Sequence, residues 1–445
     1  GSLTVSAPQS TPPGPAAAWV WDARVGAYRG LAIEYRSLIR RLTRQGRPFD
    51  DRARNYPDLP PLKQPLPPPY PYQEQAMAAW SRSKRGTVEL PTGAGKTRLA
   101  LMAMAEVRRA TLVLVPTLDL VAQWSDVVRE FLGIEAALIG GGSFDVGSVT
   151  IATYASVARH GAEFGDRFGL AVFDECHHLG GEMYAQCAEV LIAPYRLGLS
   201  ATLERPDGKH RLLDRLIGPQ VYRQGITELS GRYLADYDTR VLHAEFTREE
   251  FATYQADRQT YRRFVEANHL SLGGPAGWQR FIFIATRTAE GREALSAFYR
   301  QRRLAFAAQA KFTLLADLLR RHREERVLIF TNDNRTAYEI SRRFLLPLIT
   351  HQTKLAERKA LLGGFRSGRW PFMVTSKVLN EGVDVPAASV AVIVSGSASV
   401  REHVQRLGRI LRKDGGKRAV LYELLTRGTT EVGTSERRRQ HDAYR

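Results

Sequence analysis

Cysteine is scarce in this 445-residue sequence, which contains only Cys176 and Cys187. Two thiols cannot form the disulfide network that stabilises small secreted domains, and they fit a reducing compartment. The chain also lacks any apolar run close to the ~20 residues that a membrane-spanning helix needs. No internal repeat or low-complexity tract stands out beyond the prolines. We therefore expect a soluble cytoplasmic protein with no membrane partner.

Acidic residues are also in short supply. The 46 Asp and Glu residues face 64 Lys and Arg residues, which gives a formal net charge of +18 at pH 7. This excess predicts a polyanionic partner. The hydrophobic fraction of 44% and the charged fraction of 25% are typical of a globular chain and exclude wholesale disorder. At roughly 100–200 residues per domain, the length predicts two to four domains.

Proline marks the first boundary. The densest stretch runs from Pro57 to Pro71. Because proline fixes φ and donates no backbone hydrogen bond, we expect an extended linker there. Before it, apolar residues between Ala27 and Leu42 fall mostly at helical spacing and predict a helix. Residues 1–68 are therefore predicted to be a helical and linker region. The arginines of that helix either form a solvated face or bind DNA or a partner. The leading Gly1-Ser2 resembles a cloning remnant and is set aside.

From Gly86 onward, short runs of valine, isoleucine and leucine alternate with amphipathic helical patterns. Runs that are apolar throughout are expected of parallel strands covered by helices on both faces. The expected strands lie at 87–90, 111–115, 148–152, 170–173 and 197–199, and again at 326–331, 371–375, 390–394 and 418–422. This rhythm predicts two α/β domains with parallel sheets, residues 69–235 and 236–430. The remaining residues 431–445 are predicted to be a basic tail without periodicity.

Residues 246–309 interrupt the second domain without any strand rhythm, and we predict a helical insertion. Phe251, Tyr254, Tyr261 and Phe264 fall on one helical face, with arginines beside them. Two interpretations follow. The rings either pack the insertion onto its neighbour and leave only the arginines for nucleic acid, or they stack on bases.

A glycine-rich loop follows the first expected strand and precedes a helical pattern. It reads Thr92-Gly93-Ala94-Gly95-Lys96-Thr97. Glycines let backbone N–H groups turn toward phosphates, the lysine adds a point charge, and the threonine hydroxyl can bind Mg²⁺. The strict pattern places a further glycine at position 90, where this chain has Leu90. Because the GxGKT core is intact, we predict a nucleotide phosphate loop rather than an incidental glycine turn.

Two adjacent carboxylates, Asp174 and Glu175, follow the apolar run 170–173. The carboxyl end of a parallel strand is where such sheets place their ligands. One carboxylate can hold Mg²⁺ while the other activates the attacking water. The alternative of a zinc site would use Cys176, His177, His178 and Cys187. It is disfavoured because adjacent residues at a strand end point in different directions and no paired CxxC spacing exists.

With these two motifs about eighty residues apart and in this order, the chain resembles the superfamily 2 helicases. Further segments resemble their motifs in sequence: Val115-Pro116-Thr117 with Gln123-Trp124, Thr150 to Ser156, Ser200-Ala201-Thr202, Val327 to Thr331, Thr375-Ser376 with Glu381 to Pro386, and Gln405 to Arg412. The match covers about Tyr70 to Leu425. It implies two RecA-like motor domains in tandem that hydrolyse ATP between them.

Two segments resemble the XPB branch of these helicases: Arg196 to Arg205 and Ser376 to Gly382. That resemblance implies an ATP- and Mg²⁺-dependent DNA helicase or double-strand translocase that works in DNA repair. It also implies that the insertion is a thumb. An Arg-Glu-Asp motif of that branch reads Arg205-Pro206-Asp207 here. This departure permits the alternative of a nucleotide-gated DNA-binding scaffold that recruits a nuclease, and an RNA helicase is the other alternative.

The resemblance also implies roles for individual residues. Lys96 would bind phosphate, Thr97 and Asp174 would hold Mg²⁺, and Glu175 would activate water. Across the domain cleft, the nucleotide would meet Gly382, Asp384, Gln405, Arg409 and Arg412. The sugar-phosphate backbone of DNA would be held by Thr117, Thr153, Thr331 and Thr375, without reading sequence. Gln73 would read adenine through a bidentate contact beside a stacking Tyr70, unless Gln73 is a structural turn residue.

Overall fold

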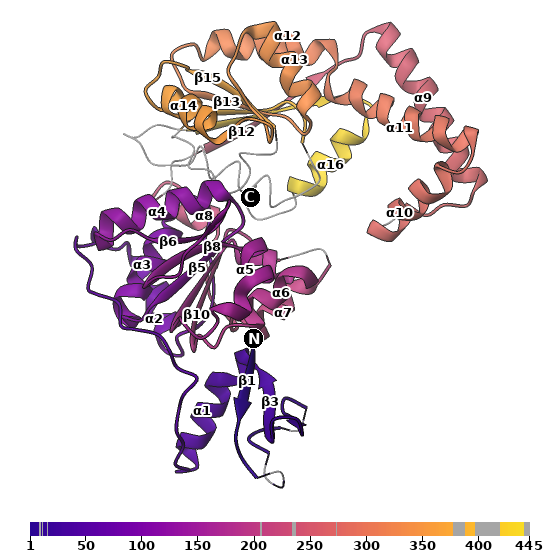
Figure 1. The fold of residues 1–445 in the computed structure, drawn as a ribbon. Coiled ribbons are helices and arrows are strands. Elements are labelled where there is room, and N and C mark those ends of the chain that lie inside the picture. Colours follow the sequence, from indigo (N-terminus) through magenta and orange to yellow (C-terminus); the bar gives the residue numbers. More distant parts are fainter. Residues whose placement is uncertain are drawn as a thin grey trace. The chain divides into compact units, whose positions relative to one another are not determined.

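The structure, a computed structural model, describes residues 1–8, 10, 12–15, 17–204, 207–233, 237–272, 274–376, 388–396 and 419–439 (Figure 1). The chain divides into two compact units. The first contains Gly1–Leu229, and the second begins at Ser230. Within the described residues, no helix is both long and apolar enough to cross a membrane.

The first unit opens with a small module of strands and a helix. Strands β1 (Ser2–Val5), β2 (Val20–Asp22) and β3 (Ala27–Leu31) form an antiparallel sheet in the order β1-β3-β2. A 3-10 turn, η1 (Ala32–Glu34), leads into helix α1 (Tyr35–Arg44). The helix predicted from Ala27 is therefore wrong over its first third. Residues 27–31 extend because they pair with β1 and β2 on both sides, a contact that helical spacing alone cannot show.

A parallel sheet forms the body of the first unit. Its order is β11-β4-β10-β9-β5-β8-β6-β7, and the only antiparallel pair among these strands is β6 with β7. The strands are β4 (Arg85–Glu89), β5 (Thr111–Val115), β6 (Ala137–Gly140), β7 (Ser143–Phe144), β8 (Val149–Thr153), β9 (Leu170–Asp174), β10 (Tyr195–Ser200) and β11 (Gln220–Arg223). The predicted parallel α/β architecture is confirmed. The central strands β5, β8 and β9 are buried along their whole length, as a sheet covered on both faces requires.

Helices cover this sheet. They are α2 (Pro71–Ser81), α3 (Lys96–Val107), α4 (Leu118–Leu132), α5 (Tyr154–His160), α6 (Glu182–Glu189), α7 (Leu212–Leu216) and α8 (Ile226–Leu229). Short 3-10 turns lie at Gly161–Glu163, Cys176–Gly180 and Lys209–Arg211.

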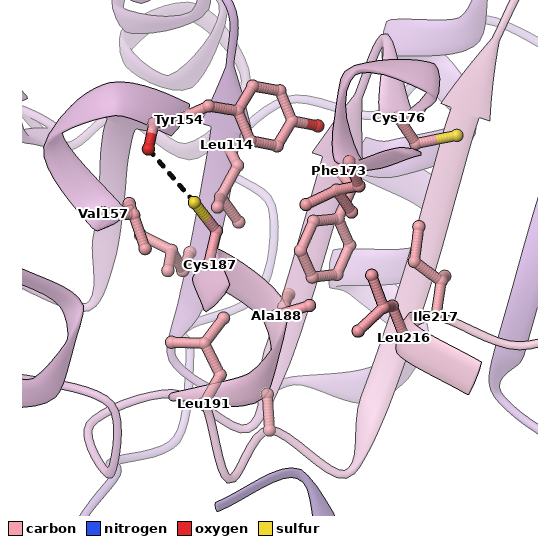
Figure 2. Close-up of a cluster of buried hydrophobic side chains, with 14 of the residues drawn as sticks. Leu114, Tyr154, Val157, Phe173, Cys176, Cys187, Ala188, Leu191, Leu216 and Ile217 are labelled. Carbon is pink, nitrogen blue, oxygen red and sulfur yellow. Dashed lines mark hydrogen bonds between the residues drawn. The ribbon is translucent and has the colours of Figure 1, made fainter. Parts of the chain in front are cut away.

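Both cysteines lie in the hydrophobic core of this unit (Figure 2). The Sγ atom of Cys187 donates to the carbonyl of Tyr154 at 3.1 Å. Burial raises the pKa of the Cys187 thiol to about 12, and that of Cys176 is raised as well. Both cysteines therefore serve to pack the core, because a reactive thiol needs a lowered pKa and access to solvent.

The second unit is built on a six-stranded parallel sheet in the order β12-β17-β16-β13-β15-β14. The strands are β12 (Tyr237–Ala244), β13 (Val327–Phe330), β14 (Leu348–Ile349), β15 (Phe372–Thr375), β16 (Val390–Ile393) and β17 (Ala419–Thr426). Helices α12 (Gln309–Arg321), α13 (Asn334–Phe344) and α14 (Leu355–Arg366) connect them. Both predicted parallel sheets are thus present.

The predicted insertion consists of helices α9 (Arg248–Ala267), α10 (Gly274–Ala285) and α11 (Ala289–Phe306), which extend from the second sheet in Figure 1. Its aromatic residues pack inside it. The Tyr261 ring lies 5.5 Å from that of Phe281 and 5.1 Å from that of Phe298, and Tyr254 is buried. The structure therefore favours packing over base stacking for these two tyrosines, while Phe251 is exposed.

The chain beyond β17 differs from the unstructured tail that we predicted. Helix α16 (Thr430–Arg439) follows the last strand. Its Glu431 is buried and pairs with buried Lys311 of α12 at 2.7 Å. The Nζ atom of Lys311 also donates to the carbonyl of Val394. The buried Lys311, which is distant in sequence, thus holds α16 in place, although the sequence of α16 has no helical periodicity.

Candidate nucleotide-binding site

The carboxyl ends of five neighbouring strands lie along one edge of the first sheet, because β4, β10, β9, β5 and β8 run parallel. The register aligns Ser200 with Glu89 and Leu199 with Asp174. The structure therefore brings the glycine-rich loop, the Asp174-Glu175 pair and the Ser200-Ala201-Thr202 segment to the same edge, as predicted from the sequence.

The glycine-rich loop has the backbone of an anion cradle. Gly93 and Gly95 have φ values of +89° and +76°, a region that residues with a Cβ rarely adopt. A Cβ at Gly95 would lie 2.5 Å from Nε2 of Gln73. Helix α3 begins at Lys96, so its unpaired N–H groups and the positive end of its dipole lie at the loop. This arrangement suits a phosphate group.

Lys96 and Glu175 face each other across the site. The Nζ atom of Lys96 lies 4.0 Å from Oε1 of Glu175 and donates to the carbonyl of Leu90 at 3.3 Å. Each side chain is only 11% exposed. A cation and a carboxylate held this close with little water interact more strongly than a surface pair.

The Asp174 carboxylate is hydrogen-bonded by a tryptophan for which we predicted a different role. The indole Nε1 of Trp124 donates to Oδ2 of Asp174 at 3.0 Å, and the backbone N–H of Glu175 donates to Oδ1 at 3.0 Å. Burial, followed by the charge of Glu175, raises the pKa of Asp174 to about 6, against the opposing effects of Trp124 and Lys96. We predicted Trp124 only as part of a nucleic-acid motif. Its buried position on α4 makes it a positioning residue for the carboxylate.

The backbone at Glu175 is in the left-handed region, with φ of 50° and ψ of 50°. A non-glycine residue there costs on the order of 1–3 kcal/mol and persists only where the surroundings enforce it. The strand ends at Asp174, and a 3-10 turn, Cys176–Gly180, follows at once. This abrupt turn at the end of β9 sets the direction of the Glu175 side chain. The residue pattern does not predict the turn.

His177 lies between Glu175 and the segment after β10. The Oε2 atom of Glu175 lies 3.5 Å from Nδ1 of His177, and Nδ1 lies 3.0 Å from Oγ of Ser200. That hydroxyl donates to the carbonyl of Thr202 at 2.8 Å and accepts from the Thr202 N–H at 3.2 Å. His177 therefore contacts Ser200 and lies beside Glu175. Within the parts of the chain that the structure covers, no group of His, Cys, Asp and Glu is arranged to hold a metal without a further ligand.

The residues at this edge fit a nucleoside triphosphate with its divalent cation. Two buried oxygens, Oγ1 of Thr92 and Oε2 of Glu175, have no hydrogen-bond partner within the described residues. Buried polar atoms are normally paired, so an unpaired one in a site indicates a missing ligand or water. Thr97 is the second residue of α3, directly after Lys96, where its hydroxyl could reach the same cation as Asp174.

We expect Trp124→Phe to lower ATP hydrolysis by about 10–100-fold, the usual cost of removing a partner that orients a metal ligand. The substitution removes the indole donor and leaves most of the buried ring volume in place. Steady-state turnover across a Mg²⁺ titration, with a thermal melt to show that the protein folds, measures the effect. A Trp370→Phe variant in the second unit, where the ring is 37% exposed, serves as the matched control. Equal activity of the two variants would contradict the positioning role.

The Gln73 side chain binds within the protein, and its role as an adenine reader stays a prediction. Gln73 is 1% exposed. Its Nε2 donates to the carbonyl of Ala94 at 3.1 Å, and its Oε1 accepts from the Tyr70 N–H and from Arg98. Both ends of the amide are therefore engaged inside the protein. Gln73 thereby connects the start of α2 to the glycine-rich loop. The exposed Tyr70 ring stacks on Tyr72, with centroids 5.7 Å apart.

The four threonines predicted to hold DNA fall into two classes. Thr117 and Thr153 cap helices α4 and α5 and accept from the N–H groups of Leu120 and Ser156. Thr331 and Thr375 are fully buried, and their hydroxyls donate to the carbonyls of Asp333 and Ser376. Thr375 is the last residue of β15 and Thr331 directly follows β13, so both lie at the carboxyl ends of their strands with their hydroxyls turned to backbone carbonyls. The DNA contacts assigned to the four threonines stay predictions.

The remaining predicted positions lie outside the described residues. They are Gly382, Asp384, Gln405, Arg409 and Arg412, together with the Arg205-Pro206 pair. Their assigned roles stay predictions.

Three family models match the chain. The model of the type III restriction enzyme res subunit matches residues 67–205, and the model of the helicase conserved C-terminal domain matches residues 310–414. The model of the Xeroderma pigmentosum group B helicase damage recognition domain matches residues 1–53. This last match covers the module of strands and one helix that we had predicted only as helix and linker.

Curated relatives and solved structures agree with these models. The "DNA 3'-5' translocase XPB2" of Sulfurisphaera tokodaii is 38% identical over 94% of this chain and 95% of its own length. The "DNA 3'-5' helicase XPB" of Kineococcus radiotolerans is 30% identical over 81% of this chain and 60% of its own. In fold, the structure of S. cerevisiae Dbp5 bound to RNA and ADP BeF3 has a TM-score of 0.59 at 17% identity, covering 85% of this chain and 88% of that one. The chain therefore belongs to the XPB family of superfamily 2 helicases.

Proposed function

We propose that this chain is an ATP- and Mg²⁺-dependent DNA translocase or helicase that moves in the 3′ to 5′ direction and serves DNA repair. The direction and the polymer come from the names of its relatives, and the repair role from the damage recognition model over residues 1–53. The excess of 64 basic over 46 acidic residues supports a polyanionic polymer.

The observation that carries the ATPase part is the convergence of Lys96, Asp174 and Glu175 at one sheet edge. The glycine-rich loop and the start of α3 supply N–H donors for the phosphates. Lys96 adds a positive charge. Thr97 and Asp174 would hold the cation, which would supply charge neutralisation for the transferred phosphoryl group. This set of donors and carboxylates supports ATP hydrolysis at this edge of the sheet.

Glu175 would orient and deprotonate the attacking water. Its Oε2 has no hydrogen-bond partner within the described residues, and its Oε1 faces Lys96. His177 lies beside this carboxylate and is hydrogen-bonded to Ser200 at the end of β10, so a shift of Glu175 on nucleotide binding would reach the loop after β10. This connection is one route by which hydrolysis could be coupled to movement on a polymer.

The ATPase rate of the purified protein, measured with single-stranded, duplex and forked DNA and with RNA of matched sequence, tests the proposal. We expect DNA to stimulate turnover more than RNA does, and Lys96→Ala to abolish it. Exposed Lys63, changed to alanine, is the matched control. Stimulation by RNA equal to that by DNA would favour the RNA helicase alternative. Undiminished turnover of the Lys96→Ala variant would contradict the assigned site.

A further inference from the structure

A groove of about 600 Å³ lies in the first unit between the N-terminal module and the parallel sheet. Helix α1 and the segment from Phe49 to Tyr56 form one side. The other side is formed by residues Ser81–Lys84, just before β4, and by Pro194 and Tyr195 at the start of β10. The groove therefore lies at the amino ends of β4 and β10, at the opposite edge of the sheet from the glycine-rich loop. We propose that this groove is a second DNA site, which binds the sugar-phosphate backbone of a single-stranded segment.

Positive charge dominates the lining of the groove. Five of the lining residues are cations and a single one is acidic; the cations are Arg36, Arg40, Arg54, Arg82 and Lys84. The acid is Asp51, whose carboxylate accepts from the Tyr35 hydroxyl at 2.6 Å. A cleft lined by one sign of charge attracts the opposite charge more strongly than a flat surface does.

Three of the five cations are available for an anion. Lys84 pairs with Glu106 at 3.1 Å, and Arg36 donates to two backbone carbonyls. Among the described residues no carboxylate lies within ion-pair distance of Arg40, Arg54 or Arg82, and all three are exposed. They come from three separate segments of the chain, and the fold brings them to one groove. Guanidinium groups suit phosphate because each can donate two parallel hydrogen bonds.

Arg36 fixes the two sides of the groove to each other. Its guanidinium donates to the carbonyl of Pro194 at 2.8 Å and to that of Ser83 at 2.5 Å. Burial, with the nearby charges of Arg40 and Arg85, lowers the pKa of Arg36 to about 10. The spacing of the arginines is therefore set before a ligand arrives, which reduces the entropy lost on binding.

Aromatic rings lie between these cations. Arg54 lies 5.1 Å from the centroid of the Tyr56 ring, and Lys84 lies 5.7 Å from that of Tyr195. Phe49, at the rim, is 43% exposed. Grooves for single strands combine cations for the backbone with rings on which bases stack. Tyr56 and Tyr195 already have cations over their rings, whereas the exposed Phe49 could stack on a base beside the free arginines, so the lining favours a nucleic acid.

The test uses a triple variant, Arg40→Ala, Arg54→Ala and Arg82→Ala, in the full chain. Its affinity for a fluorescent oligothymidylate is measured by anisotropy over a salt series without nucleotide. We expect roughly 10-fold weaker binding at 0.1 M salt. The slope of log K against log salt should fall by about 2, at about 0.7 for each lost phosphate contact to a single strand. A triple lysine variant at the same positions should retain most of the affinity.

The control variant carries the same change in charge outside the groove, as Arg44→Ala, Arg47→Ala and Arg108→Ala, all three exposed. Equal affinity and equal slope of the two alanine variants would overturn the groove as a DNA site. A groove variant that binds DNA normally but loses binding to polyglutamate would overturn it in favour of an acidic protein partner. The proposal rests on the proposed function. The Lys96→Ala variant tests that function separately, so the groove can fail while the ATPase assignment stands.

Discussion

Replacing Glu175 with glutamine is expected to lower the kcat of ATP hydrolysis by about 10²–10⁴-fold, the contribution of a positioned general base. Glutamine has nearly the same shape and cannot accept the proton of water. ATP binding should persist because the glycine-rich loop, Lys96 and Thr97 are unchanged. Single-turnover hydrolysis and binding of a fluorescent ATP analogue, measured on the same preparation, separate the two effects.

The matched control is Glu130→Gln on the exposed face of α4, which removes the same charge away from the site. Its turnover should equal that of the unmodified protein. A Glu175→Gln variant that loses nucleotide binding in parallel with kcat would instead indicate that the carboxylate only maintains the structure of the site.

Arg196→Met is expected to destabilise the first unit by about 3–5 kcal/mol, because each buried carbonyl that loses its donor costs roughly 1–3 kcal/mol. Arg196 is 1% exposed, and its guanidinium donates four hydrogen bonds, all to backbone carbonyls: those of Ala188, Leu191, Ala193 and Leu216. These acceptors close the ends of α6 and α7 and the approach to β10. Methionine fills the volume and leaves the acceptors buried without donors, which is more costly than the loss of the bonds alone.

Urea unfolding followed by far-UV circular dichroism measures this effect. Arg196→Lys should also destabilise the unit, because a single ammonium cannot reproduce the fixed fork of a guanidinium. Arg215→Met on α7 removes a half-exposed arginine that pairs with Glu189 at the surface, and little change in stability is expected. Similar unfolding midpoints for Arg196→Met and Arg215→Met would show that the carbonyls find other donors.

The parallel sheets could be predicted because their signal is local. Each buried strand is a short apolar run, and parallel pairing places their carboxyl ends together, which is how Lys96 and Asp174 could be assigned to one edge without coordinates. The antiparallel module at residues 1–31 gave no such signal. Its strand Ala27–Leu31 carries apolar residues at helical spacing, and its pairing partner is the distant Ser2–Val5.

Side-chain roles within the site were less predictable than its location. Gln73 has the residue type of an adenine reader, but its surroundings engage both ends of its amide in the glycine-rich loop and the start of α2. Trp124 and His177 gained their roles from contacts with Asp174 and Glu175 that no spacing in the sequence encodes. A residue pattern shows which chemistry is available, and packing decides which atoms can still reach a ligand.

Helix α4 carries both Thr117 at its amino end and Trp124 on its buried face. The two residues are separated by seven positions, or roughly 10 Å along the axis of a helix. A displacement of the amino end of α4 would therefore move the Trp124 indole as well, and with it the donor that orients the Asp174 carboxylate. The Asp174 carboxylate would therefore be sensitive to a force applied at the amino end of α4.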